Sequence, residues 1–190
     1  MIDCHCHLCD DQFDKDLSEV IERAKQAGVI GCLVNTENIP EFQKCFDLSE
    51  RYPNFFLPCI GVHPVQYENE NGEFIGRSVN ENDVNGIEKH LRTNLNRVVA
   101  IGEGGSGSAS VCKILNCTLA LNFMLYNLPL RADLSLFHKN LSMFFYVGLD
   151  YTPRFIHSDT DKSNQKEVFR RQIELAKTHQ LPVYRSNLFC

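Results

Sequence analysis

The N-terminal half of the chain alternates short apolar runs with longer segments in which apolar side chains recur every three or four positions. The short runs predict strands, and the longer segments predict amphipathic helices. The expected strands are 2–7, 29–34, 55–61 and 98–102, and the expected helices are 17–28, 38–53 and 84–91. Strands that alternate with helices usually pair in parallel, so the pattern predicts an α/β fold with a parallel sheet or barrel.

The regular pattern is interrupted twice. The segment between Gly61 and Val84 is polar and rich in Asn and Glu, and we expect a loop there. From Gly104 to Tyr146 the chain begins with a Gly- and Ser-rich run, contains few charges and keeps neither the strand nor the helix period, so its fold is not readable from the pattern. A helical pattern returns at about Ser163, and 181–184 reads as the beginning of a fifth strand.

Composition narrows the class of protein. The chain has 190 residues, of which 43% are hydrophobic and 23% charged, which is typical of one globular domain. A net charge of −5 excludes a protein that binds nucleic acid mainly through an extended basic surface. Any contact with nucleic acid must therefore be confined to a small part of the surface. Nine cysteines without a secretory signal predict reduced thiols and an intracellular, cytoplasmic or nuclear location. The longest apolar stretch is broken by charges and proline, so we expect no membrane span.

His5 and His7 are the first candidate ligands. Two positions apart on a strand, they point to the same side, and the carboxyl end of a barrel strand is where ligands converge. Neutral imidazole is a common ligand of zinc and similar divalent metals. Two alternatives remain open: a pair of histidines in a polar turn, and a zinc knot of Cys4, Cys6 and Cys9, which lacks a spaced CxxC partner.

Glu103 and His63 also follow strands directly. Taken alone, Glu103 is either a metal ligand or a helix cap, and a lone histidine such as His63 is more often structural. The carboxyl ends of parallel barrel strands meet at one mouth, however, so these groups and the histidine pair are expected close together. The sequence therefore predicts one site at that mouth.

Three spaced motifs resemble those of the TatD-type metal-dependent deoxyribonucleases, most of all an animal branch of that family. They occur in the family's order, as Ile-Asp-Cys-His-Cys-His-Leu at 2–8, Gly-Val-His-Pro at 61–64 and Ala-Ile-Gly-Glu at 100–103. Further matches are Gly-Leu-Asp at 148–150, Pro-Arg-Phe at 153–155 and the segment 165–172 that precedes Leu-Pro-Val at 181–183. The resemblance covers 1–103 and about 147–183.

The resemblance implies a fold, a reaction and roles for the site residues. The fold is a TIM-like (β/α)8 barrel of the amidohydrolase type, and the reaction is two-metal hydrolysis of DNA phosphodiester bonds. By this resemblance His5 and His7 bind one metal, Glu103 bridges two metals and is the catalytic carboxylate, and His63 lies by the substrate phosphate. The cofactors are two divalent ions, among zinc, magnesium and manganese, and DNA is the partner. No membrane or protein partner is implied.

The chain departs from the family pattern in two places. The 104–146 segment separates Glu103 from Gly-Leu-Asp, which the family keeps contiguous, and its removal restores the motif in frame, as for an extra exon or retained intron. The tail at 184–190 diverges and has Ser186 where the family has a metal-binding histidine. We therefore expect 1–190 to be a single incomplete hydrolase domain, a partial barrel that lacks the C-terminal strands.

A partial site predicts weak metal affinity and little turnover. Two alternatives to an active nuclease stay open: a catalytically inactive partial-barrel splice product, and an amidohydrolase-type hydrolase that acts on another substrate.

Overall fold

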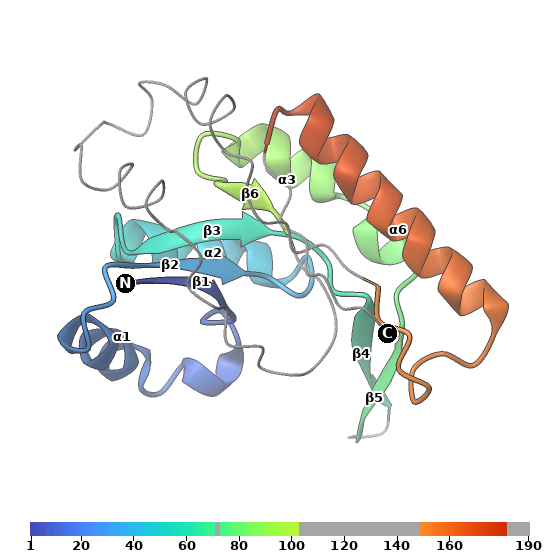
Figure 1. Ribbon diagram of the computed structural model, residues 1–190, viewed down its shortest axis with the longest axis horizontal. Helices are drawn as coiled ribbons and strands as arrows, with labels where there is room; N and C mark the ends of the chain where they lie inside the picture. The colour runs from blue at the N-terminus through green and yellow to red at the C-terminus, as the bar shows by residue number, and fades with distance from the viewer. Residues whose placement is uncertain (71–72, 103–148, 182–190) are drawn as a thin grey trace.

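A computed structural model describes residues 1–70, 73–102 and 149–181 of the chain (Figure 1). The expected insertion at 104–146, the expected divergent tail at 184–190 and the side chain of Glu103 lie outside these residues. The described residues contain a parallel sheet, a separate hairpin and four α-helices.

The central feature is a four-stranded sheet with the order β1-β2-β3-β6. These strands are Ile2–Cys6, Gly31–Asn35, Phe56–Ile60 and Ala100–Ile101, and all neighbouring pairs are parallel. They coincide with the four strands that the apolar runs predict. Because every neighbouring pair is parallel, all four strands bring their carboxyl ends to the same edge of the sheet.

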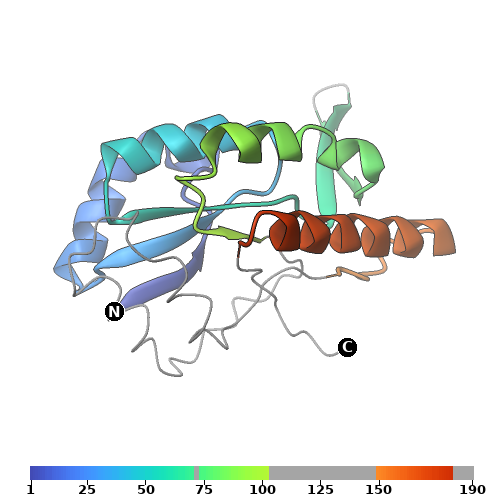
Figure 2. The same cartoon turned by 90° about the horizontal axis from the view of Figure 1, so that it is seen from above.

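Three helices cover one face of this sheet (Figure 2). They are α1 (Leu17–Gln26), α2 (Glu41–Arg51) and α3 (Ile87–Asn94), and each turns its apolar stripe inward. Short 3-10 turns precede α1 and α3, at Asp11–Phe13 and Glu81–Val84. Just beyond α1, Gly28 adopts φ of 85°, the left-handed conformation that favours glycine and ends a helix.

A hairpin occupies the segment for which the sequence predicted a loop. Strand β4 (Val65–Glu70) pairs in antiparallel register with β5 (Glu73–Ser78), from Val65 opposite Ser78 to Glu70 opposite Glu73. The prediction of a loop was wrong because the many Asn and Glu side chains hid an alternation of β-forming residues. The sequence Asn-Gly at 71–72 is the strongest short signal for a hairpin between two such runs.

The longest helix is α6 (Asp159–Thr178), which packs against β5, β6 and the 3-10 turn Glu81–Val84 that precedes α3 (Figure 1). It begins four residues before the expected start at Ser163, because its first turn is wholly polar and carries no apolar period. Ser158 and Asp161 form a reciprocal capping box that fixes this start. Over the ranges that the structure describes, no helix is long and apolar enough to cross a membrane.

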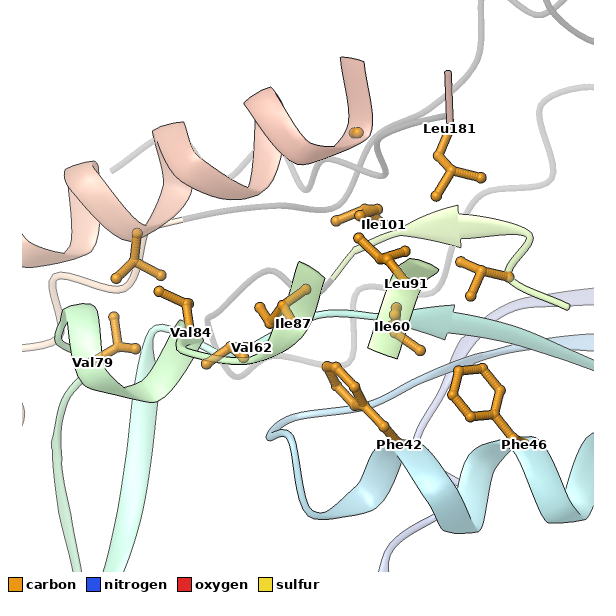
Figure 3. Close-up of a cluster of buried hydrophobic side chains, with 13 residues drawn as sticks. Phe42, Phe46, Ile60, Val62, Val79, Val84, Ile87, Leu91, Ile101 and Leu181 are labelled. Carbon is orange, nitrogen blue, oxygen red and sulfur yellow. The ribbon is translucent and has the colours of Figure 1, made fainter. Parts of the chain in front are cut away.

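The core forms two clusters. The larger one joins α2, the sheet, α3 and α6, and it includes Phe42, Ile60, Leu91, Ile101 and Leu181 (Figure 3). Its members come from both sides of the 104–146 segment, so the residues before and after that segment share one core. The second cluster lies between α1, α2 and the first strands.

Candidate metal centre

His5 and His7 come together at the carboxyl end of β1, as the sequence predicts. Their Nε2 atoms are 3.0 Å apart, and the rings meet edge to face with centroids 4.8 Å apart. Two imidazole nitrogens that share a tetrahedral metal, with bonds of about 2.0–2.1 Å, are separated by about 3.3 Å. The observed spacing is within a few tenths of an ångström of that value. The donor set therefore fits a divalent cation.

His5 is held in its neutral form. Its pKa is lowered to about 4, chiefly by burial and in addition by the neighbouring His7 and His63. A neutral imidazole keeps a lone pair for a metal, whereas a protonated one does not. The other ring nitrogen, Nδ1, is 3.2 Å from Nδ2 of Asn35, a fully buried residue at the end of β2.

His63 follows β3 and lies at the same edge. Burial has the largest effect on the pKa of His63 and lowers it. The nearby charges of Glu37 and Asp150 act in the opposite direction. Nδ1 of His63 is 3.0 Å from the backbone nitrogen of Val65, which can only donate, and 2.9 Å from the Val65 carbonyl oxygen, which can only accept. In the tautomer in which Nδ1 accepts from the Val65 N–H, the hydrogen of the neutral ring is on Nε2, which becomes a donor to an anionic oxygen; in the other tautomer, Nδ1–H donates to the Val65 carbonyl.

Carboxylates surround the three histidines. Glu37 follows β2, and its Oε1 is 4.0 Å from Nδ1 of His7. Asp150 is buried, and its charge opposes the lowering of the His63 pKa. At the first residue of α2, the pKa of Glu41 is raised to about 7, chiefly by burial and in addition by the charges of Glu37 and Asp10. This edge of the sheet thus presents imidazoles and acidic groups together, a combination that suits a cation.

Two buried glutamines of α6 hold the segment that carries His63. Gln172 accepts a hydrogen bond from the Val62 N–H at 2.9 Å and donates to the Val62 carbonyl at 3.2 Å. Gln165 donates to the Pro64 carbonyl at 3.3 Å and also bonds both backbone groups of Asp150, at 2.8 and 2.7 Å. The residues on either side of His63 are therefore tied to the same helix.

The cysteine knot proposed as an alternative is not favoured by the positions of the thiols. Cys9 is buried and lies near the free thiol of Cys45, while the free thiol of Cys6 lies near that of Cys32 and donates to the Leu33 carbonyl at 3.5 Å. Hydrogen bonding and burial raise the pKa of both Cys6 and Cys45. Cys6 and Cys9 thus have separate partners on different elements.

The structure brings His5, His7 and His63 to one edge, and Glu103, the other predicted site residue, lies outside the described residues. The sequence analysis did not identify Asn35 and Glu37. Both stand at the end of β2, so the rule that identified the histidines at the ends of β1 and β3 would have found them. Asp150 was noted only as part of a motif.

Comparison with known proteins places these residues in a wider context. A family model described as TatD related DNase matches residues 2–112. Human deoxyribonuclease TATDN3 is 34% identical over 183 residues, which are 96% of this chain and 50% of that protein. The uncharacterized metal-dependent hydrolase YabD of Bacillus subtilis is 31% identical over 184 residues, covering 96% of this chain and 49% of the relative.

A solved structure is similar as well. The crystal structure of YJJV, a TatD homolog from Escherichia coli K12, superposes with a TM-score of 0.57 at 20% identity, covering 96% of this chain and 49% of the other. This likeness confirms the predicted α/β fold of the TIM-like type. The chain spans about half the length of the relatives that it matches.

Proposed function

Because this chain belongs to the TatD related DNase family, we propose that it is a metal-dependent hydrolase of DNA phosphodiester bonds. The observation that carries the proposal is the pair of Nε2 atoms of His5 and His7, 3.0 Å apart at the carboxyl end of β1. The names of two relatives support it, since one is a deoxyribonuclease and the other a metal-dependent hydrolase. We propose that 1–190 forms one such domain, interrupted at 104–146.

His5 and His7 would hold the first divalent cation, and Glu103 would bridge it to a second, as the motif implies. A bound divalent ion lowers the pKa of a coordinated water to near neutrality and neutralises charge on a phosphoryl oxygen. Imidazole suits zinc, and carboxylate oxygen suits magnesium and manganese, so this mixed set accommodates each of the three ions named by the sequence analysis. Local positive charge of this kind lets an acidic protein bind a phosphodiester.

The protein's own groups would prepare the ligands and position the substrate. Burial keeps His5 neutral, so its lone pair is available near neutral pH. Glu37 lies beside Nδ1 of His7, where a carboxylate orients a metal-binding ring. The backbone of Val65 holds Nδ1 of His63, and in the tautomer in which Nδ1 accepts from the Val65 N–H, the Nε2–H would donate to a phosphate oxygen. The two glutamines of α6 would keep that histidine at a fixed distance from the pair.

Metal binding is the first test. Titration calorimetry of the chelator-treated protein with zinc or manganese should show affinity that falls in His5→Ala and in Glu103→Ala. Cys9→Ser is the control, because that thiol is fully buried and lies near Cys45. An equal loss of affinity in all three variants would instead favour a cysteine-based site.

DNA cleavage is the second test. Labelled single- and double-stranded DNA is incubated with the protein and magnesium, manganese or zinc, and His5→Ala and Glu103→Ala set the background. The departures from the family pattern predict a low rate, so the expected result is slow, metal-dependent cleavage that both substitutions abolish. Cleavage that persists in His5→Ala, or no cleavage with any of the metals, would contradict a nuclease role for this chain.

A further inference from the structure

Three potential ligands outside the histidine pair gather on the first two strands: the carboxylate of Asp3 and the thiols of Cys6 and Cys32. We propose that they form a second cation site, one for a thiophilic divalent ion such as zinc or cadmium. This inference goes beyond the proposed hydrolase function, because the cluster contains neither His5 nor His7.

The spacing of the three groups is close to that of a metal site. One ligand atom from each residue lies within 4.8 Å of the other two. In a tetrahedral zinc site with Zn–S bonds of about 2.3 Å and Zn–O bonds of about 2.0–2.2 Å, neighbouring ligand atoms are about 3.4–3.8 Å apart. Closure around an ion therefore requires side-chain movements of about 1 Å, which rotamer adjustments supply.

An irregularity in β1 creates this grouping. In a regular strand, residues three apart such as Asp3 and Cys6 point to opposite faces. The pairing of β1 with β2 shifts register between these two residues, since Asp3 is opposite Cys32 whereas Cys6 is opposite Val34. Such a shift re-aims a side chain, and here it brings the Cys6 thiol within 4.8 Å of the Cys32 thiol.

The ligand atoms of Asp3, Cys6 and Cys32 determine which ion the site would prefer. An ion that binds here displaces the two thiol protons, so two thiolates and one carboxylate bring three negative charges, and thiolate sulfur favours zinc or cadmium over magnesium. Cys32 is 3% exposed and anchors the site from inside, while Asp3 is exposed, which leaves a route for the ion and a position for water. Asp3 Oδ1 accepts a hydrogen bond from the His5 backbone nitrogen at 3.0 Å, which uses only one of its two oxygens.

A cadmium titration tests the proposal, because thiolate-to-cadmium charge transfer absorbs in the ultraviolet and histidine coordination gives no such band. The full chain, freed of metal and kept reduced with a phosphine, is titrated with cadmium chloride. We expect a saturable band at one equivalent that is lost in Cys6→Ser and in Cys32→Ser. Asp3→Asn, which keeps an acceptor for the His5 N–H, should retain the band and bind at least tenfold more weakly.

Two controls separate this site from others. Cys9→Ser removes a buried free thiol that lies near Cys45 and is not one of the three proposed ligands. This substitution should leave the band unchanged. His5→Ala should also leave it unchanged, so failure of the histidine site and failure of the thiol site are distinguishable. A band that is absent, that persists in both Cys6→Ser and Cys32→Ser, or that disappears in His5→Ala would overturn the proposal.

The cadmium titration still gives a clear result if Cys32→Ser does not fold. Circular dichroism and thermal melts establish which variants fold. Should Cys32→Ser fail to fold, Cys6→Ser and Asp3→Asn decide the result, because both positions are more exposed. Wild-type behaviour of these two variants would then overturn the site.

Discussion

Asn35 reaches across from β2 to the metal-binding candidate His5, with Nδ2 of Asn35 3.2 Å from Nδ1 of the imidazole. Among the described residues, Oδ1 of the same buried amide has no hydrogen-bond partner. A metal on Nε2 of His5 requires the hydrogen of the neutral ring on Nδ1. Turning the amide by 180° would then let Oδ1 accept from Nδ1–H, at the cost of the 3.4 Å hydrogen bond that Nδ2 donates to the Leu33 carbonyl.

From this relationship we predict that Asn35 positions His5 for metal binding. Asn35→Leu should lower zinc or manganese affinity about 10- to 100-fold, the usual effect of losing a group that orients a metal-binding histidine. Asn35→Asp keeps an acceptor for Nδ1–H and should bind at least as tightly as the wild type. Titration calorimetry on the folded variants measures both, and equal affinity of the Leu and Asp variants would contradict the role.

Gln172 should contribute strongly to stability. Gln172→Leu leaves the buried N–H and carbonyl of Val62 without their side-chain partners, which costs about 2–4 kcal/mol of unfolding free energy. Gln43→Leu is the control, since that glutamine is exposed on α2 and should change stability by no more than about 0.5 kcal/mol. Urea denaturation gives both values. A loss below about 1 kcal/mol in Gln172→Leu would show that these bonds matter little.

Gly76 of β5 lies directly against an aromatic ring. A Cβ at this position would be 2.5 Å from Cε1 of Phe155 and 3.2 Å from Cε1 of Tyr67. Gly76→Ala should therefore destabilise the protein by about 1–2 kcal/mol, the cost of displacing the ring. On a Phe155→Ala background the same substitution should cost much less, and a double-mutant cycle measured by thermal unfolding tests this. Equal costs on the two backgrounds would exclude the clash as the cause.

The pH dependence of stability should reflect Glu41. Its pKa is raised from 4.5 to about 7, chiefly by burial, so between these pH values the folded protein keeps a proton that the unfolded chain has released. The stability linked to this proton is fully present below about pH 4.5 and is lost as pH rises through 7.

The comparison with Glu41→Gln isolates this effect. As pH rises from 5 to 8, the unfolding free energy of the wild type should fall relative to that of Glu41→Gln. Glu19→Gln, an exposed position of α1, should show no such relative change. Urea denaturation across this range measures the difference, and parallel pH profiles for wild type and Glu41→Gln would refute the assignment.

The sequence predicts the sheet and the histidines for the same physical reason. Strand periodicity identifies β1, β2 and β3, and parallel pairing then places His5, His7 and His63 at one edge without any knowledge of contacts. Glu37 was accessible to this reasoning, because it too follows a strand.

Other features depend on contacts that a one-dimensional pattern does not contain. The grouping of Asp3 with Cys6 arises from the register shift between β1 and β2, which depends on pairing rather than on the sequence of β1 alone. Gln165 and Gln172 read as ordinary polar positions of a helix, and only the packing of α6 makes them buried partners of the His63 segment.

The bond between α6 and Val62 has a consequence for the order of folding. Gln172 and Val62 are 110 positions apart in the chain, whereas β1, β2 and β3 pair with close neighbours. Contacts of low sequence separation close small loops and can form early, and distant ones pay a larger entropy of loop closure. During synthesis, the strands that carry His5 and His7 can therefore assemble well before the ribosome has made the helix that fixes His63. The candidate site would reach its final geometry only late in folding.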